Sequence, residues 1–249
     1  GALAIFCRQT CVIWTVFGLG VLVLQEFRTG RENDKSFLEE ALSVVRLLGA
    51  WKNLRKVFAN SFPLLIVLLG FLAFAWRNGG VAVGDKNNHE VGLHPMQAFY
   101  LSSFAWLVSS PFHIFSSSCA NFIASIRANR FLTIASLCVI VYLIHNFTYA
   151  HPFVLSDNRH YVFYIWKKIF RSRSWPRYAL APFYLYSVFS TFHLLRRSQS
   201  AVWVIWFLVC SVLTVIPTGL LEPRYFIIPV ALLLIHLPFQ PRAANGRAG

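Results

Sequence analysis

The stretch FLTIASLCVIVYLIHNFTY, residues 131–149, decides the class of fold. It contains the almost purely apolar run VIVYLI, and its length is close to the ~20 apolar residues that a helix needs to cross a bilayer. Further stretches of similar character lie at about 2–24, 57–76, 96–120, 178–194, 201–220 and 225–239. The sequence therefore predicts an all-α fold, a polytopic transmembrane helix bundle with about seven membrane segments.

The composition supports this class. Of the 249 residues, 57% are hydrophobic and only 13% are charged, whereas a soluble domain carries about a quarter charged residues. The net charge of +14 is therefore expected to interact with lipid phosphates. A nucleic-acid-binding protein would gather its base-reading groups on a soluble domain, and the sequence has none, so no nucleic-acid partner is expected.

Metal and cofactor sites are not expected either. His89 and His94 are five residues apart with no third ligand nearby, and a protein zinc site needs at least three. All cysteines fall in apolar stretches without metal-like spacing, which is typical of buried free thiols. They are Cys7, Cys11, Cys119, Cys138 and Cys210.

The basic residues are unevenly distributed between the two sides that alternating crossings predict. One side holds 25–56, with the amphipathic pattern FLEEALSVVRLLGAWKNL, together with 121–130, 195–200 and the C-terminus, and it carries 13 Lys and Arg. The other side carries 10, of which six lie in the connection 150–177. Without that connection the first side is strongly basic and hence cytosolic. Either the orientation is inverted, or these six cations are held on the far side for a reason.

The stretch LSDNRHYVFYIWKK (155–168) suggests such a reason. Arg159 and His160 stand beside Asp157 and Asn158 between two long apolar runs. An arginine binds phosphate through two parallel charge-assisted hydrogen bonds, while Asp and Asn suit sugar hydroxyls. A membrane surface that offers both kinds of group fits a phospholipid-linked sugar.

For the second half of the same stretch, a membrane-anchoring role is predicted. YVFYIWKK fits an interfacial helix lying in the headgroup region, anchored by Trp166, Lys167 and Lys168. Anchoring is the favoured role for the two lysines, whereas Arg159 and His160 precede the anchor.

Three further segments place candidate residues on the same predicted side. Glu222 and Arg224 in LLEPRY either pair with each other at a helix end or contact a ligand. Arg8 in CRQT stands near the start of the first segment, where an ionisable residue marks a site or snorkels to the surface. Asp85, Glu90 and the two histidines occupy the polar connection 77–95 on this side.

Four motifs in matching order resemble one family. They are FCRQT (6–10), GDKNNHEVGLH with the following QAFY (84–100), FTYAHPFVLSDNRHYVFYIWKK (147–168) and LLEPRYFIIP (220–229). Together they resemble the dolichyl-phosphate-glucose-dependent α-1,2-glucosyltransferases of the endoplasmic reticulum, members of the glycosyltransferase C superfamily. The FTYAH…DNRHY motif is the most distinctive of the four.

The resemblance implies a multi-pass protein of the endoplasmic reticulum membrane whose motif connections face the lumen. It implies transfer of glucose, with inversion, from dolichyl-phosphate glucose to the diglucosylated oligosaccharide on dolichyl pyrophosphate. We expect Arg159 and His160 to contact the donor phosphate, and Asp157 and Asn158 either to contact sugar hydroxyls or to orient Arg159. Glu222, Arg224 and Arg8 follow as further substrate contacts.

The chain also departs from the family pattern. The acidic residues expected to supply the catalytic base would precede residue 1, so the base is unknown, and 1–239 would be a partial glycosyltransferase domain followed by a disordered tail at 240–249. HPMQ (94–97) differs from the usual pattern, which weakens any role for His94.

Two alternatives to an active enzyme remain. One is a transporter or channel-associated subunit without chemistry, and the other is an inactive truncated form. A transporter predicts charges within its membrane segments and a repeated helix pattern. The apolar segments here hold few charges and no repeat, which favours the enzyme.

Overall fold

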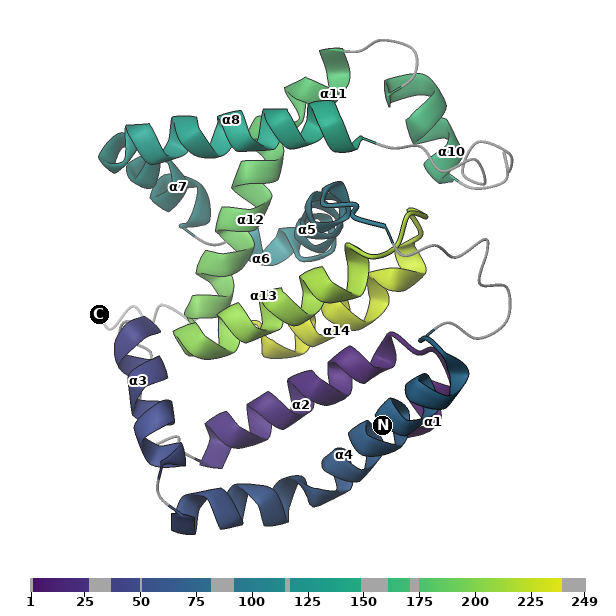
Figure 1. The fold of residues 1–249 in the computed structure, drawn as a ribbon. Helices are drawn as coiled ribbons and strands as arrows, with labels where there is room; N and C mark the ends of the chain where they lie inside the picture. Colours follow the sequence, from purple (N-terminus) through teal and green to yellow (C-terminus); the bar gives the residue numbers. More distant parts are fainter. Residues whose placement is uncertain are drawn as a thin grey trace, which may run out of the picture.

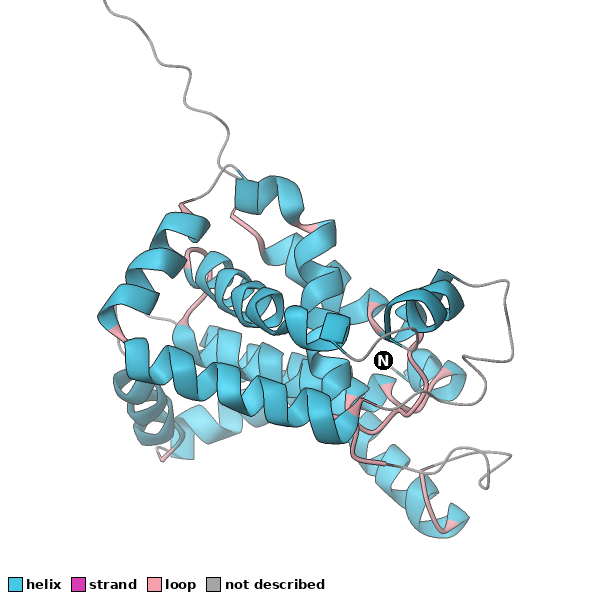
Figure 2. Cartoon of the chain, turned by 90° about the horizontal axis from the view of Figure 1, so that it is seen from above, coloured by secondary structure: helices cyan, strands magenta, loops and turns pink. Residues whose placement is uncertain are grey.

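The computed structural model describes residues 2–26, 37–49, 51–81, 92–114, 117–148, 161–170 and 175–238, and every regular element in these ranges is helical (Figures 1 and 2). The predicted all-α fold is thus confirmed for the described part of the chain. The expected tail at 240–249 lies outside it. The helices are α1 (Ala2–Cys7), α2 (Cys11–Glu26), α3 (Phe37–Leu48), α4 (Trp51–Asn78), α5 (Met96–Val108), α6 (Ser110–Ile114), α7 (Ser118–Ala128), α8 (Arg130–Phe147), α10 (Tyr161–Ile165), the π-helical turn η2 (Trp166–Phe170), α11 (Trp175–Ala179), α12 (Ala181–Arg196), α13 (Ala201–Val215), the 3-10 turn η3 (Pro223–Tyr225) and α14 (Ile227–His236).

Two described helices are long and apolar enough to cross a membrane. They are α4 from Lys52 onward, with 27 residues, and α8, with 18 residues. In the 18-residue apolar stretch of each helix, only 11% is buried inside the protein. Both helices therefore present apolar side chains outward. The shorter apolar helices are α2, α5, α13 and α14. The predicted number of seven crossings is therefore not confirmed, although the apolar helices are compatible with a membrane protein.

Two of the predicted segments are divided. Residues 2–24 form α1 and α2, which are separated at Arg8–Thr10, where the Cys11 backbone N–H donates to the Arg8 carbonyl at 2.9 Å. Three consecutive polar residues interrupt the apolar run at this point. Residues 96–120 form α5, α6 and the start of α7.

Local hydrogen bonds explain the polar residues at the end of α5. The buried Ser109 hydroxyl donates to the Ala105 carbonyl at 2.6 Å, and its oxygen lies 3.0 Å from His113 Nε2. Pro111 follows directly and has no N–H with which to continue the α5 ladder. These residues therefore end a helix.

Small residues let α5 and α12 approach closely. The Ser102 and Ser187 hydroxyl oxygens lie 3.0 Å apart across the two helices. Ser187 and Ser190 are both 0% exposed. Serine at such a contact brings two backbones together and satisfies its own hydroxyl by hydrogen bonding.

Helices α2 and α13 make a second close contact, which depends on Gly20. A Cβ atom at Gly20 would lie 2.2 Å from Trp206 Nε1 and 2.7 Å from Cε2 of the same indole. The indole N–H reaches past the glycine and donates to the Phe17 carbonyl at 3.3 Å. The indole thus occupies the space that only glycine leaves open.

In Figure 1, α2, α4, α8, α13 and α14 run roughly from side to side, so that their ends lie on two sides of the bundle, whereas α12 crosses them and α5 is seen end-on. At one end lie α3, the end of α2, the starts of α4, α8 and α13 and the end of α14. At the other lie α1, α10, α11, the ends of α4, α8 and α13 and the start of α14. Helix α3 and the junctions α7–α8 and α12–α13 thus lie on one side, and the alternation of crossings between the two sides stays a prediction. We call the two ends the α3 end and the Arg8 end.

Candidate functional site

Arg8 meets the LLEPRY segment across 216 positions of sequence. Arg8 Nη1 donates to the Arg224 carbonyl oxygen at 3.1 Å, and the guanidinium carbon lies 4.2 Å from the centroid of the Tyr225 ring. The break between α1 and α2 places Arg8 at the end of the bundle, where it reaches η3. The first and the last of the four motifs therefore form one cluster.

The turn η3 organises the other charges of this cluster. Glu222 caps the turn, and its carbonyl accepts the Tyr225 N–H at 3.1 Å. The Glu222 carboxylate forms an ion pair with Arg224 Nε, with side chains 28% and 60% exposed. The predicted mutual pairing of these two residues is confirmed, and at this exposure it contributes little to stability.

Tyr225 lies between the two cations. The Arg224 guanidinium carbon is 5.6 Å from the ring centroid of Tyr225, and the Arg8 guanidinium also lies over that ring. Contacts of this kind are worth about 0.5–1 kcal/mol at exposed sites. The cluster contains two guanidinium groups and one carboxylate, so it has a net positive charge. We call Arg8, Glu222, Arg224 and Tyr225 the Arg8 cluster.

The end of the polar connection 77–95 and the start of α5 form hydrogen bonds with the residues that precede LLEPRY. The backbone N–H of His94 donates to the Ile216 carbonyl at 3.0 Å. The side-chain N–H of Gln97, which is 4% exposed, donates to the Thr218 carbonyl at 3.2 Å. His94 and Gln97 thus help to fix the backbone beside the Arg8 cluster.

The aromatic part of the LSDNRHYVFYIWKK motif also packs on LLEPRY. Trp166 is 5% exposed and contacts Phe170, Leu220 and Leu221. The prediction that Trp166 anchors the helix in the headgroup region is therefore wrong. Its ring buries its apolar surface against Phe170, Leu220 and Leu221 instead.

The lysines of the same motif behave as predicted for exposed residues. Lys167 and Lys168 are exposed, and their ammonium groups lie 5.3 Å and 5.8 Å from the ring centroids of Phe163 and Tyr164, respectively. Their role as membrane anchors stays a prediction.

The predicted site residues fall into two groups. Arg8, Glu222 and Arg224 come together at one end of the bundle. The others lie outside the described residues: Asp157, Asn158, Arg159 and His160, and from the first polar connection Asp85, His89 and Glu90. Sequence reasoning missed Tyr225, although an aromatic residue directly after Arg224 is the signal that points to it.

Comparison with known proteins identifies the relationship. The model of the DIE2/ALG10 family matches residues 1–235. The chain belongs to the DIE2/ALG10 family. The resemblance predicted from the four motifs is thereby confirmed.

Several curated relatives of this family carry the name Dol-P-Glc:Glc(2)Man(9)GlcNAc(2)-PP-Dol alpha-1,2-glucosyltransferase. The relative from Homo sapiens is 34% identical over 94% of this chain and 52% of its own length. The relative from Mus musculus is 34% identical over 96% of the chain and 55% of its length, and that from Debaryomyces hansenii 30% identical over 96% and 51%. The chain thus spans about half the length of the curated relatives it matches. No solved structure matches it.

The side chains of the Arg8 cluster indicate which kind of ligand this member of the DIE2/ALG10 family can bind there. Arginine forms short, charge-assisted hydrogen bonds to phosphate oxygens. Both guanidinium groups lie over the Tyr225 ring, which restricts their orientation. The cluster can therefore bind an anionic group that carries two or more acceptor oxygens.

Proposed function

We propose that this DIE2/ALG10 family chain acts in a membrane α-1,2-glucosyltransferase. The enzyme transfers glucose from dolichyl-phosphate glucose to the diglucosylated oligosaccharide on dolichyl pyrophosphate and so completes the N-glycan precursor. The observation that carries the proposal is the relationship: relatives from a mammal and a yeast, matched over nearly the whole chain, share a name that states this reaction.

The charge arrangement supports the same reaction. Both lipid substrates bring phosphate groups to the membrane surface, and the Arg8 cluster presents two guanidinium groups at the end of the bundle. The donor phosphate departs as a stable anion, so it needs positive charge rather than a proton. We assign phosphate contacts to Arg8, Arg224, Arg159 and His160.

Sugar recognition is the second part of the proposal. Asp157 and Asn158 contact hydroxyl groups, which both donate and accept hydrogen bonds. Glu222 holds Arg224 through their ion pair and so orients it towards substrate. The inverting step needs a carboxylate that deprotonates the acceptor hydroxyl.

The orientation in the membrane follows from the same charges. We place the Arg8 end in the lumen of the endoplasmic reticulum and the α3 end in the cytosol. The shorter apolar helices cross the bilayer beside α4 and α8 in this arrangement. The cations of the connection 150–177 are then kept on the luminal side to meet lipid phosphate.

The decisive test is glucose transfer from labelled dolichyl-phosphate glucose to the diglucosylated lipid-linked oligosaccharide. The full-length protein is expressed in membranes that lack the native activity, beside Arg159→Ala, Arg8→Ala and two control variants. The controls are Arg77→Ala, an exposed cation at the end of α4, and Lys167→Ala. We expect about tenfold to hundredfold losses at Arg159 and Arg8 and less than about twofold losses at the controls.

Two results would overturn the proposal. Absence of transfer by well-expressed, folded protein would favour a non-catalytic membrane subunit. Equal losses in all four variants would show that the loss follows total charge instead of specific phosphate contacts.

A further inference from the structure

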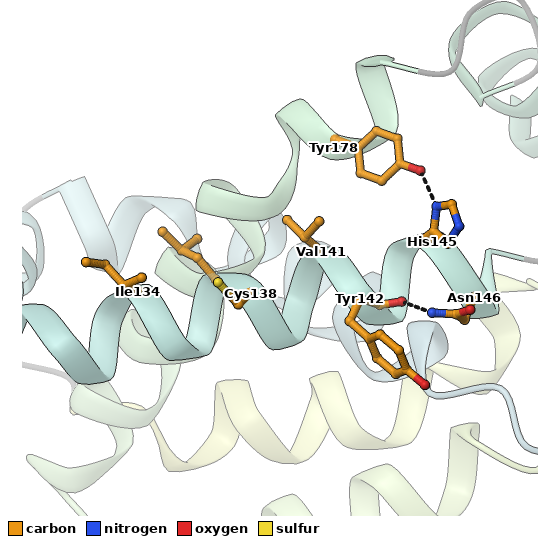
Figure 3. Close-up of a pocket in the computed structure, with 8 residues that line it drawn as sticks. Ile134, Cys138, Val141, Tyr142, His145, Asn146 and Tyr178 are labelled. Atoms are coloured by element: carbon orange, nitrogen blue, oxygen red, sulfur yellow. Dashed lines mark hydrogen bonds between the residues drawn. The ribbon is translucent and has the colours of Figure 1, made fainter.

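A groove follows one face of α8 (Figure 3). It is an open pocket of about 620 Å³, within the range of sites that hold small ligands. It begins among apolar side chains and ends among polar ones. The lining residues are Ile134, Leu137, Cys138, Val141, Tyr142, His145, Asn146 and Tyr178.

The shape of the groove fits one extended chain. The α8 residues that line it recur at intervals of three and four, which makes a single stripe along the helix. From Ile134 to His145 the stripe is roughly 16 Å long, at a rise of 1.5 Å per residue. A lipid with two acyl chains needs a wider surface. One unbranched path along a helix that is apolar enough to cross a membrane suits a single hydrocarbon chain.

The polar end of the groove holds a connected set of hydrogen bonds. The Tyr178 hydroxyl lies 2.9 Å from His145 Nδ1 (Figure 3), and Arg177 Nη2 donates to the same hydroxyl oxygen at 3.2 Å. When Arg177 donates to this oxygen, the Tyr178 proton is free to be donated to His145. Arg177 does not itself line the groove but is linked to it through Tyr178, which does.

Arg177 retains hydrogen-bonding capacity for a ligand. Its side chain is half-buried, and its Nε atom is buried without a hydrogen-bond partner among the residues that the structure describes. Its guanidinium carbon lies 4.9 Å from the ring centroid of Tyr178, which fixes the plane of the group. An unpaired buried N–H is costly, and a phosphate oxygen would satisfy it together with the positive charge.

We propose that the α8 groove binds the hydrocarbon chain of a polyprenyl phosphate and that Arg177 receives its phosphate. The inference rests on the proposed function, because that function requires such a lipid at the Arg8 end. Arg177 belongs to the same connection, 150–177, as Arg159 and His160, so the donor is the lipid assigned to the groove. Tyr178 and His145 position Arg177 and close the site above the chain.

The polar end of the groove lies on the same side of the bundle as the Arg8 cluster. Tyr100 packs with Tyr178 in one cluster of side chains and with Leu221 and Tyr225 in another. A donor held along α8 therefore presents its phosphate on the side of the bundle that also carries the Arg8 cluster.

The test uses a photoactivatable polyprenyl phosphate and the full-length protein in detergent micelles. Crosslinked peptides are mapped by mass spectrometry in the wild type, Val141→Trp and Val139→Trp. Both valines are exposed on α8, and only Val141 lines the groove. A tryptophan at 141 fills the groove, so we expect about a tenfold loss of labelling on α8 and a similar rise in KM for the donor. The Val139 variant should stay within about twofold of the wild type.

Competition and a second variant make the assignment specific. Unlabelled polyprenyl phosphate should displace the probe, whereas phosphatidylinositol should not. Arg177→Gln should weaken labelling several-fold, and Arg177→Lys should recover part of it, because the charge returns without the planar fork.

The failures of the two proposals are distinguishable. Normal transfer by the wild type with unchanged labelling and KM in Val141→Trp overturns the groove and leaves the proposed reaction intact. Equal displacement by phosphatidylinositol also overturns it, since the groove then holds bilayer lipid. Groove labelling without glucose transfer supports the lipid site and counts against the reaction.

Discussion

The two ends of the bundle use their charged residues differently. At the α3 end, Glu40 is 2% exposed, and its carboxylate accepts the Val202 backbone N–H at 3.1 Å, at the start of α13. Glu26 there pairs with Lys56 and accepts from Asn60 at 3.1 Å. At the Arg8 end, the half-buried Glu222 carboxylate pairs with Arg224, while Arg8 contacts the Arg224 carbonyl and the Tyr225 ring.

The charged residues at the two ends therefore have different roles. A carboxylate buried at a helix N-terminus satisfies backbone donors and interacts favourably with the helix dipole, so it holds α3 against α13. Guanidinium groups that stack on a tyrosine at an exposed position contribute little to stability and remain open to anions. Substitutions at the α3 end should therefore change stability, and substitutions at the Arg8 end should change activity.

The largest effect is expected for Arg8→Ala. Loss of a charge-assisted contact of about 1.5–3 kcal/mol in the transition state corresponds to a tenfold to hundredfold fall in kcat/KM. Thermal stability in detergent should stay close to that of the wild type. A variant that loses activity only in proportion to folded protein would place Arg8 among structural residues and remove the contrast between the ends.

Glu40→Ala tests the opposite end. The change leaves the Val202 N–H buried without its acceptor, which should cost about 1.5–3 kcal/mol and lower the Tm by several degrees. Glucose transfer per folded molecule should be unchanged. The neighbouring exposed Glu39→Ala is the matched control, and a Tm loss as large as that of Glu40→Ala would contradict a specific role for the buried carboxylate.

Gly20→Ala examines the scaffold between the two ends. The added methyl group would collide with the rigid Trp206 indole, and overpacking of this kind costs about 1–3 kcal/mol. Gly18→Ala is the control, because its Cβ would meet only Leu64 Cδ1 at an ordinary 3.8 Å. Thermal unfolding of both variants checks the prediction. Equal Tm values would mean that α2 and α13 separate without cost.

The smallest effect is expected for Tyr225. Replacement by leucine removes the ring on which both guanidinium groups stack, a loss of about 0.5–1 kcal/mol, so kcat/KM should fall a few-fold. Phenylalanine keeps the ring and should restore nearly full transfer. If Tyr225→Phe is as impaired as Tyr225→Leu, the hydroxyl group and not stacking is what matters.

The family and the all-α class of the fold could be predicted from the amino-acid sequence alone. A bilayer requires apolar helices of limited length, and such helices can be recognised from continuous stretches of sequence such as 131–149. The pairing of Glu222 with Arg224 was also predictable, since two residues of opposite charge stand two positions apart at a helix start.

Only the tertiary structure decided which distant residues meet. The contact of Arg8 with the Arg224 carbonyl joins residues 216 positions apart, and no local pattern specifies it. Trp166 was expected at the membrane surface, but Leu220 and Leu221 bury it, and Glu40 acquires a role only when α3 meets α13. Propensity and hydrophobicity act over a few residues, whereas these contacts depend on how whole helices pack, and it is that packing which forms the Arg8 cluster.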